Sequence, residues 1–212
     1  MPQIVPFIEP TDDRLQTLRL VVDPTLIPRF YPILQAGFFV KVRTGESVGQ
    51  LLRGQWGLSE DYVRERISTI FLDGKPLDDV DSATVREGST LALSSAMPGL
   101  VGATMRRKGF YASFRGSITY KEEAQHPPEK DGFFRVKLFN LLMEELGTLL
   151  LGKGIYVPSS EIREFLANQS DLFFAGCREI VLDGQSMEVS PLRETGWSER
   201  REWVQLTVCA SQ

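Results

Sequence analysis

One segment of the chain combines cations with aromatic rings in a pattern that suits binding. Residues 106–115 read RRKGFYASFR, and no acidic residue occurs from Thr90 to Tyr120. Arginine and lysine bind phosphates or carboxylates, and aromatic rings stack on bases or fill apolar pockets. The candidate binding surface consists of Arg106, Arg107, Lys108, Phe110, Tyr111 and Arg115.

Three interpretations of this basic aromatic segment stay open. It can bind a protein or an anionic ligand, or it can contact nucleic acid. It can also be a staple between domains, with buried aromatic rings and cations that remain solvated. The third interpretation needs no partner at all.

Residues for metal or acid–base chemistry are sparse. The single histidine, His126, precedes two prolines and argues against a histidine-rich metal centre or a Ser-His-Asp arrangement. Asp78, Asp79 and Asp81 lack the spacing of a calcium loop, which indicates a solvated turn. The stretch GKG at 152–154 has no serine or threonine after its lysine, as a phosphate loop requires. We therefore expect no catalytic residue, no metal site and no cofactor.

Composition sets broad limits on the class of protein. Hydrophobic residues make up 42% and charged residues 25%, which is typical of a globular protein. A net charge of −4 argues against a dedicated nucleic-acid binder. The longest apolar stretch, 138–151, is interrupted by Glu144, Glu145 and Gly147, and the N-terminus lacks the basic region of a signal peptide. We expect a cytoplasmic protein with no membrane contact.

Alternation and capping signals predict the same series of elements in each half of the chain. An N-terminal arm rich in proline, residues 1–12, precedes the first half. The first half is expected to contain strands at 15–22 and 36–44, a helix with Ser47 as its N-cap, another helical turn or two from Ser59, a strand and turn at 70–77, and a strand at 91–95. The second half repeats this order with strands at 132–140 and 147–157, a helix with Ser159 or Ser160 as its N-cap, a strand and turn at 178–187, and a strand at 201–210.

The two halves share one phrase at the expected hairpin. Residues 70–77 read IFLDGKPL, and residues 180–187 read IVLDGQSM. An Asp-Gly pair favours a type I′ turn, because glycine accepts a positive φ and aspartate tolerates it. We interpret the matching order around this phrase as an internal duplication.

This order of elements predicts an α+β protein of two tandem β-grasp (ubiquitin-like) domains. Each would be a mixed sheet crossed by one main helix. We expect the first domain at 13–103 and the second, β-grasp-like domain at 133–212. Residues 104–132 would form an aromatic and basic connector that ends in a proline-rich loop.

The cysteines Cys177 and Cys209 form a candidate cross-strand pair. In a β-grasp domain the third strand lies antiparallel to the last, and a register with Leu182 opposite Val204 places the two cysteines opposite each other. That geometry permits a disulfide or a redox pair. The alternative is two small reduced residues buried in neighbouring strands.

Three stretches of the first half carry a resemblance to a known family. They are VGQLL at 48–52, IFLDGKPL at 70–77 and VREGSTLALSSAMPGLVGA at 85–103. The first half thereby resembles the β-grasp sulfur carriers, namely the small subunit of molybdopterin synthase and the sulfur carrier of thiamine biosynthesis. The second half resembles these carriers more weakly, which suggests two sulfur-carrier-like domains in tandem.

The chain departs from this family at the carrier tail. The carriers end in Gly-Gly, whose terminal carboxylate is adenylated and converted to a thiocarboxylate. Here Gly99 and Gly102 are separated by two residues, and the chain continues beyond them. These glycines are a candidate vestigial tail, and only cleavage near Gly102 would expose a carboxylate there.

The sequence therefore favours a non-catalytic protein-interaction or assembly module built on sulfur-carrier-like domains. The resemblance implies an adenylating or sulfur-transfer enzyme as a possible class of protein partner. The competing hypothesis is sulfur transfer, either after cleavage near Gly102 or through Cys209. We do not expect a nucleic-acid partner, and the sequence leaves the oligomeric state open.

Overall fold

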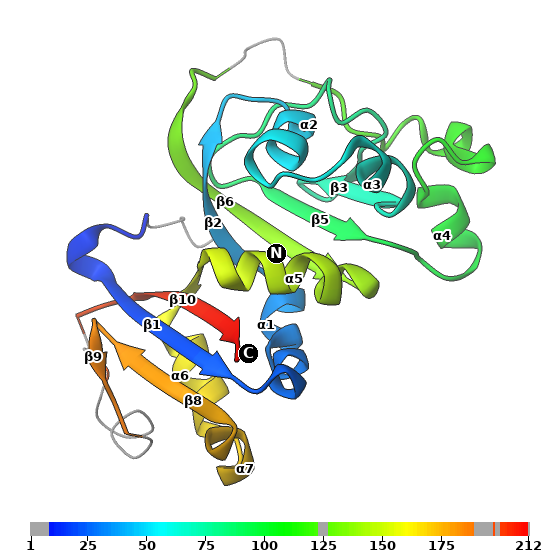
Figure 1. Cartoon of the computed structure of the whole chain (residues 1–212). Coiled ribbons are helices and arrows are strands. Elements are labelled where there is room, and N and C mark those ends of the chain that lie inside the picture. Colours follow the sequence, from blue (N-terminus) through cyan, green and yellow to red (C-terminus); the bar gives the residue numbers. More distant parts are fainter. Residues whose placement is uncertain (1–8, 123–126, 189–196, 198–199, 212) are drawn as a thin grey trace. The chain divides into compact units, whose positions relative to one another are not determined.

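The computed structural model describes residues 9–122, 127–188, 197 and 200–211 (Figure 1). It contains both helices and mixed β-sheet, so the predicted α+β class is confirmed. The chain forms two compact units, a central unit of Tyr31–Gly147 and a terminal unit of Met1–Phe30 with Thr148–Gln212. These units differ from the expected consecutive ranges 13–103 and 133–212, because each half of the chain contributes to both.

The central unit contains five strands in the order β4-β3-β5-β6-β2. Strands β5 and β6 run parallel, and the other neighbours are antiparallel. The strands are β2 (Phe38–Thr44), β3 (Thr69–Leu72), β4 (Lys75–Pro76), β5 (Thr90–Ser94) and β6 (Lys130–Phe139).

Short helices surround this sheet, and two of them begin where the sequence predicts. The Ser47 side chain accepts a hydrogen bond from the Gln50 backbone N–H, and the Gln50 side-chain oxygen accepts one from the Ser47 backbone N–H, which completes a capping box. Ser59 caps the next helix by accepting from Tyr62. The helices are α1 (Tyr31–Ala36), α2 (Val48–Gln50), the π-helical turn η3 (Leu51–Gln55), α3 (Glu60–Glu65), α4 (Gly99–Met105) and the 3-10 helix η4 (Phe110–Arg115).

Alternate side chains of the central strands form the core of this unit. Phe38 and Val40 of β2 and Phe134 and Val136 of β6 are buried on the same face. The helical residues Leu51, Leu52, Val63 and Ile67 are also buried. The two-residue period of the strands thus decides which side chains leave water.

The terminal unit contains five strands in the order β7-β10-β1-β8-β9. Strands β1 and β10 run parallel, and the other neighbours are antiparallel. The strands are β1 (Leu15–Val22), β7 (Ile155–Pro158), β8 (Cys177–Leu182), β9 (Gln185–Ser186) and β10 (Trp203–Ala210).

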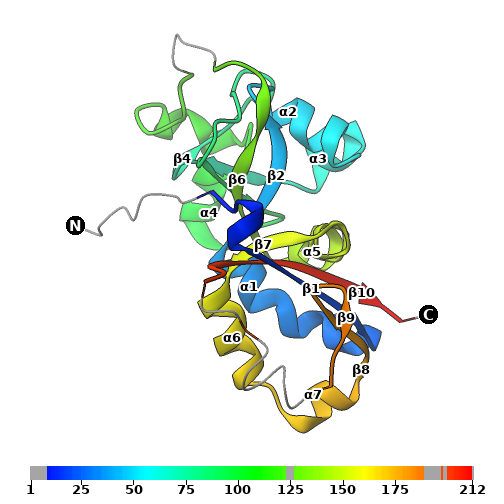
Figure 2. The same ribbon diagram turned by 90° about the vertical axis from the view of Figure 1, so that its left-hand side faces the viewer.

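Helices cover the terminal sheet around a cluster of phenylalanines. Helix α6 (Ser159–Ala167) packs against β7 and β10, and α7 (Asp171–Ala175) packs against β8 (Figure 2). The ring of Phe30, at the end of the 3-10 helix η2 (Pro24–Phe30), lies 5.1 Å from that of Phe165 and 5.9 Å from that of Phe173. The short 3-10 helix η1 (Asp12–Arg14) precedes β1.

Two expectations for the second half need correction. Residues 148–153, expected in a strand, belong to the helix α5 (Leu141–Lys153), and only Ile155–Pro158 is extended. The apolar residues of this run recur at helical spacing, and Leu142, Leu146 and Leu150 are each buried. Helix α6 begins at Ser159 after Pro158, so neither expected serine is its N-cap. No helix among the described residues is long and apolar enough to cross a membrane.

Strands β1 and β6 explain why the units are not consecutive. β1 lies between β10 and β8 in the terminal unit, although it comes from the first half of the chain. β6 lies between β5 and β2 in the central unit, although it begins the second half. Both strands alternate apolar and polar residues, and alternation predicts a buried face but not which strands will pair.

The repeated Leu-Asp-Gly phrase forms the same turn in both units. Asp73 and Gly74 have φ angles of 51° and 76°, and Asp183 and Gly184 have φ angles of 49° and 78°. Positive φ at both central residues is the signature of the predicted type I′ turn. The repeated hairpin is therefore confirmed.

Each hairpin aspartate also binds the strand beside it. Asp73 Oδ1 accepts a hydrogen bond of 2.7 Å from the Thr90 backbone N–H at the start of β5. Asp183 Oδ1 accepts one of 3.0 Å from the Thr17 backbone N–H in β1. The same aspartate-to-backbone hydrogen bond thus occurs within each unit, and neighbouring strands run in the same relative directions in both. Strand β1 occupies the position in the terminal sheet that β5 occupies in the central sheet.

Candidate binding surface

The six residues of the predicted binding surface divide into an inward and an outward set. Arg115 is only 3% exposed and Arg107 is half-buried, whereas Arg106, Lys108, Phe110 and Tyr111 are exposed. The segment belongs to the central unit and carries helices α4 and η4 (Figure 1). Residues 99–118 are called the lobe below.

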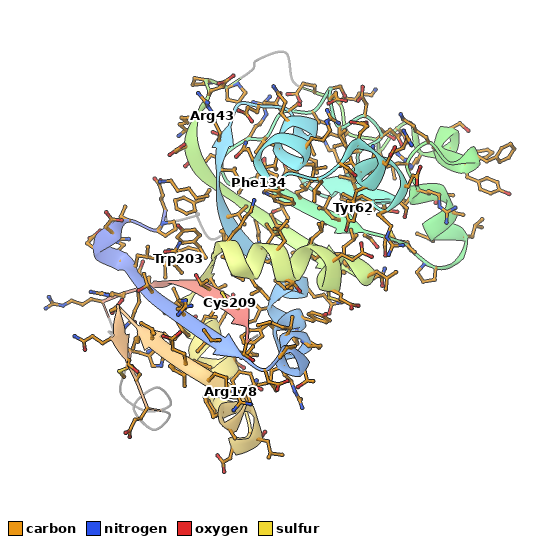
Figure 3. All side chains as sticks on the ribbon, in the orientation of Figure 1. Arg43, Tyr62, Phe134, Arg178, Trp203 and Cys209 are labelled. Atoms are coloured by element: carbon orange, nitrogen blue, oxygen red, sulfur yellow. The ribbon has the colours of Figure 1, made fainter. Side chains whose placement is uncertain are left out.

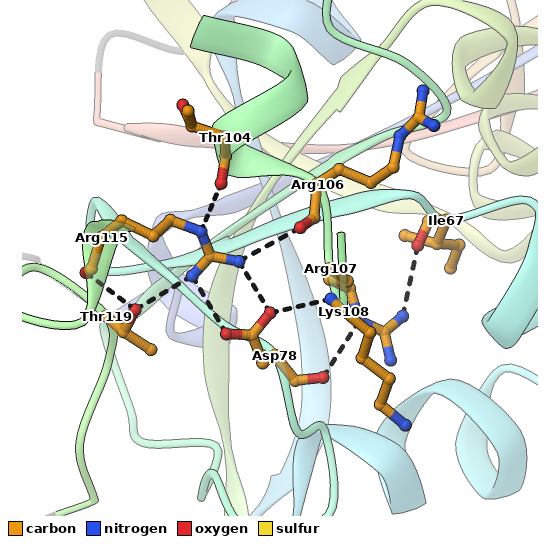
Figure 4. Close-up of polar contacts among 8 residues, drawn as sticks. All are labelled: Ile67, Asp78, Thr104, Arg106, Arg107, Lys108, Arg115 and Thr119. Atoms are coloured by element: carbon orange, nitrogen blue, oxygen red, sulfur yellow. Dashed lines mark hydrogen bonds and ion pairs between the residues drawn. The ribbon is translucent and has the colours of Figure 1, made fainter. Parts of the chain in front are cut away.

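Arg115 holds the lobe together from inside. Its guanidinium forms two hydrogen bonds with the carboxylate of Asp78, at 2.7 and 3.1 Å (Figure 4). It also donates to the backbone carbonyls of Thr104 at 2.7 Å and Arg106 at 3.3 Å, and to the Thr119 hydroxyl. A forked pair with a carboxylate is the strongest geometry available to arginine. Arg115 therefore connects the end of α4, the link to η4 and the loop after β4.

Arg107 fastens the lobe to the body of the central unit. Its side chain donates to the carbonyls of Val63 at 3.0 Å, Ile67 at 3.2 Å and Asp78 at 3.3 Å. Its backbone N–H donates to the carbonyl of Ser68 at 2.8 Å. Burial lowers the pKa of the Arg107 guanidinium, while the Asp78 carboxylate opposes this shift. Arg107 is thus a structural residue and presents no free charge to a ligand.

The outward face of the lobe is apolar. Phe110 is 87% exposed and Phe114 is 77% exposed. The Phe110 and Tyr111 rings meet edge to face at 5.1 Å, and the Tyr111 and Phe114 rings lie 6.1 Å apart. The exposed large hydrophobic residues of the lobe are Leu100, Val101, Phe110, Tyr111, Phe114 and Ile118. Exposed large apolar side chains gathered in one short segment point to a candidate interaction site.

Sequence reasoning missed part of this surface. It identified the aromatic residues Phe110 and Tyr111 but not Leu100, Val101 and Ile118, which are also exposed. It also interpreted Asp78 as part of a solvated turn, whereas Asp78 is the counter-ion of Arg115. The long stretch without acidic residues is the signal that could have directed attention to the whole of residues 99–118.

The candidate vestigial tail, Gly99 and Gly102, is part of this lobe. Gly99 has a φ of 75° and starts α4 after Pro98. Gly102 is buried, and a Cβ atom there would lie 1.9 Å from the carbonyl oxygen of Met97. Glycine is therefore needed at position 102 for close backbone packing inside a helix. Both glycines therefore lie within the helix α4.

The two cysteines do not face each other. Strand β1 lies between β8 and β10, so Cys177 is opposite Val22 and Cys209 is opposite Val21. Both thiols are free, and Cys209 lies in β10 (Figure 3). Burial raises the pKa of the Cys177 thiol, whose sulfur lies 3.4 Å from the Phe173 carbonyl oxygen. The expected register is corrected because β10 pairs with β1 and β7.

The aspartates after the first hairpin have structural contacts. Asp79 accepts a hydrogen bond of 3.0 Å from the Asp81 backbone, and Asp81 forms an ion pair with Arg53. Among the described residues, no group of three or more His, Cys, Asp or Glu side chains could hold a metal ion. His126 lies outside the described residues.

Glu122 secures the segment that leaves the lobe. Its carboxylate accepts hydrogen bonds from the Thr84 backbone at 2.7 Å and from Arg86 at 2.6 Å. Burial favours its neutral form, but these hydrogen bonds prevail and lower the pKa of Glu122. Tyr120 N–H also donates to the Pro76 carbonyl at 2.8 Å. Both ends of the lobe are thus bound to the central unit.

Comparisons with known proteins leave the lobe without a counterpart of known role. No protein-family model matches the chain, and searches of the curated proteins and of the solved structures give no significant match.

Proposed function

We propose that this protein is a non-catalytic interaction module that docks a protein partner through the lobe. The observation that carries the proposal is the set of six exposed apolar side chains on residues 100–118. Exposed apolar side chains leave water when a partner covers them, and each large one is worth about 1.5–3 kcal/mol when fully buried. Several together can offset the cost of association, about 4–15 kcal/mol.

The bracing beneath the apolar face supports this proposal. Arg115 and Arg107 hold α4 and η4 through the Asp78 carboxylate and through backbone carbonyls. A surface held in place before binding loses less conformational freedom when the partner arrives. The three aromatic rings contact one another, which further restricts their motion.

We also propose that both units are β-grasp-like and that the chain exchanges strands between its two halves. The matching directions of neighbouring strands, the shared Asp-Gly turn and the helix before that hairpin support this. The resemblance of the first half to sulfur carriers makes adenylating and sulfur-transfer enzymes the first partner classes to test. This partner class is suggested by resemblance alone, since fold does not imply function.

Site-specific photo-cross-linking tests the proposed function. Phe114 is replaced by p-benzoylphenylalanine in the full chain, in cells that make the protein naturally. Leu172, which is 82% exposed in α7, receives the same replacement as a matched control. We expect a discrete protein adduct from position 114 that is absent from position 172 and is lost in the Leu100→Ser/Phe110→Ser background.

A urea unfolding measurement shows whether the double variant loses the adduct because it is unfolded. The urea midpoint of the Leu100→Ser/Phe110→Ser variant should equal that of the parent chain, because exposed side chains add little to stability. Adducts from position 114 that are no more specific than those from position 172 would contradict a docking role for the lobe.

A further inference from the structure

The lobe has an unusual distribution of charge as well as an apolar face. No aspartate or glutamate occurs from Thr90 to Lys121. Four cations lie within residues 106–115, namely Arg106, Arg107, Lys108 and Arg115. Their surroundings separate them into two pairs with different roles.

One pair is already satisfied within the central unit. Arg115 is neutralised by the Asp78 carboxylate, and Arg107 donates to three backbone carbonyls. Replacing either residue would therefore disturb the support of the lobe before it changed any contact with a partner.

The other pair points outward. The side chains of Arg106 and Lys108 are exposed and extend away from the Asp78 carboxylate (Figure 4). Within the described part of the chain, no ion pair joins either side chain to a carboxylate. Both residues are engaged through the backbone: the Lys108 N–H donates to Asp78 Oδ1 at 3.2 Å, and the Arg106 carbonyl accepts from Arg115 at 3.3 Å.

The outward cations lie in the link between the two apolar helices. Leu100 and Val101 precede them on α4, and Phe110 and Phe114 follow them on η4. A partner that covers both helices must therefore also meet Arg106 and Lys108. A partner without carboxylates there would cover these cations without compensation, which is costly for a charge that loses water.

We infer that the lobe binds an acidic amphipathic segment of its protein partner, one that sets carboxylates between apolar side chains. This inference rests on the proposed function and adds the chemistry of the partner to it. The apolar side chains supply most of the affinity. Carboxylates opposite Arg106 and Lys108 supply selectivity and faster association.

Two other occupants fit the same observations less well. In a symmetric dimer the same face meets itself, which would bring together lobes that each carry the outward cations and no carboxylate. Two outward cations are fewer than the clusters of basic residues that hold proteins on anionic membranes.

Charge reversal in the cross-linking experiment tests this inference. Adduct formation from p-benzoylphenylalanine at position 114 is compared in the parent chain, in Arg106→Glu/Lys108→Glu and in Arg163→Glu. Arg163 is an exposed cation of α6 and serves as the matched control. We expect the yield to fall at least about tenfold in the double variant, the equivalent of about 1.4 kcal/mol, and to stay unchanged in the control. The cross-linked peptide of the partner should carry a net negative charge.

The outcomes separate this inference from the proposed function. A protein adduct that forms equally well in Arg106→Glu/Lys108→Glu would overturn the acidic partner but leave the docking role intact. The absence of any specific protein adduct would overturn both. Cross-links to a second copy of this chain, or binding to vesicles of 70% phosphatidylcholine and 30% phosphatidylglycerol that is lost in the double variant, would assign the lobe to those occupants instead.

Discussion

At the scale of single residues, the hairpin aspartates Asp73 and Asp183 do more than shape a turn. Each adopts a positive φ, which aspartate tolerates better than most residues. Each also accepts a backbone hydrogen bond from a neighbouring strand, at Thr90 and Thr17 respectively. The side chain thereby joins the turn to the first residues of another strand.

We predict that Asp73→Ala lowers the stability of the central unit by about 0.5–1.5 kcal/mol, because the Thr90 N–H loses its acceptor and the turn loses a favoured residue. Asp73→Asn should cost less, since its amide oxygen still accepts from the Thr90 N–H and asparagine tolerates a positive φ. Urea unfolding of both variants measures this. Equal losses for the two variants would show that the carboxylate charge, and not the hydrogen bond, is the important feature.

A second residue-scale prediction concerns the acid sensitivity of Glu145. Its carboxylate is bound by Arg66 and accepts a hydrogen bond of 2.6 Å from the Tyr62 hydroxyl. The Arg66 contact, helped by Tyr62 and opposed by burial, lowers the pKa of Glu145 below its usual 4.5. The folded state therefore binds the proton less readily than the unfolded state, and the added stability is complete only above that pH.

We expect the difference in unfolding midpoint between the parent chain and Glu145→Gln to be largest near pH 7 and to shrink as the pH falls below 4.5. Thermal unfolding followed from pH 7 to pH 3 measures it. The exposed Glu164 of α6 provides a control variant, Glu164→Gln, which should show no such convergence. A gap that widens as the pH falls would contradict the role given to Arg66.

At the scale of elements, the lobe depends on contacts from outside itself. Helices α4 and η4 are short, and short helices are marginal in water by themselves. Their arrangement comes from Arg115 and Asp78, which are 37 positions apart. The apolar side chains remain exposed because the buried arginines, and not a hydrophobic core, hold the two helices.

We predict that Arg115→Met destabilises the central unit by about 3–5 kcal/mol, because the partly buried Asp78 carboxylate loses its counter-ion. Limited proteolysis should then cut within residues 99–118 before other parts of the central unit. The double variant Arg115→Met/Asp78→Asn should recover part of the loss, since no unpaired charge remains. A double variant no more stable than the single one would indicate that the carbonyl contacts dominate.

At the scale of the whole molecule, each unit takes a central strand from the other half of the chain. β1 belongs to the terminal unit and β6 to the central unit. Without its central strand, each mixed sheet would lose hydrogen-bond partners on two sides. The two halves of the sequence are therefore not independent folding units, even though each contains the full order of elements.

We predict that fragments 1–122 and 127–212 are each largely unfolded and fold when mixed. The first fragment lacks β6 and the second lacks β1. Far-ultraviolet circular dichroism and size-exclusion chromatography of the separate and mixed fragments test this. Fragments that are each compact and show no spectral change on mixing would favour consecutive domains.

Local signals in the sequence explain what could be predicted. The type I′ turns followed from Asp-Gly pairs, and the starts of α2 and α3 from Ser47 and Ser59. The buried faces of strands such as Leu15–Val22 followed from alternation. The run at 148–153 was assigned to a strand because a short apolar run suits either a strand or a buried helix.

The sequence by itself determined the α+β class, the duplicated hairpin and the location of a basic aromatic segment. Only the tertiary structure decided which strands pair, which cysteine neighbours which residue and which cations of the segment face outward. The physical reason is the separation along the chain of the residues that interact. Turn conformation and periodicity depend on neighbouring residues, whereas the partner of β1 or of Arg115 depends on packing between residues far apart in the chain.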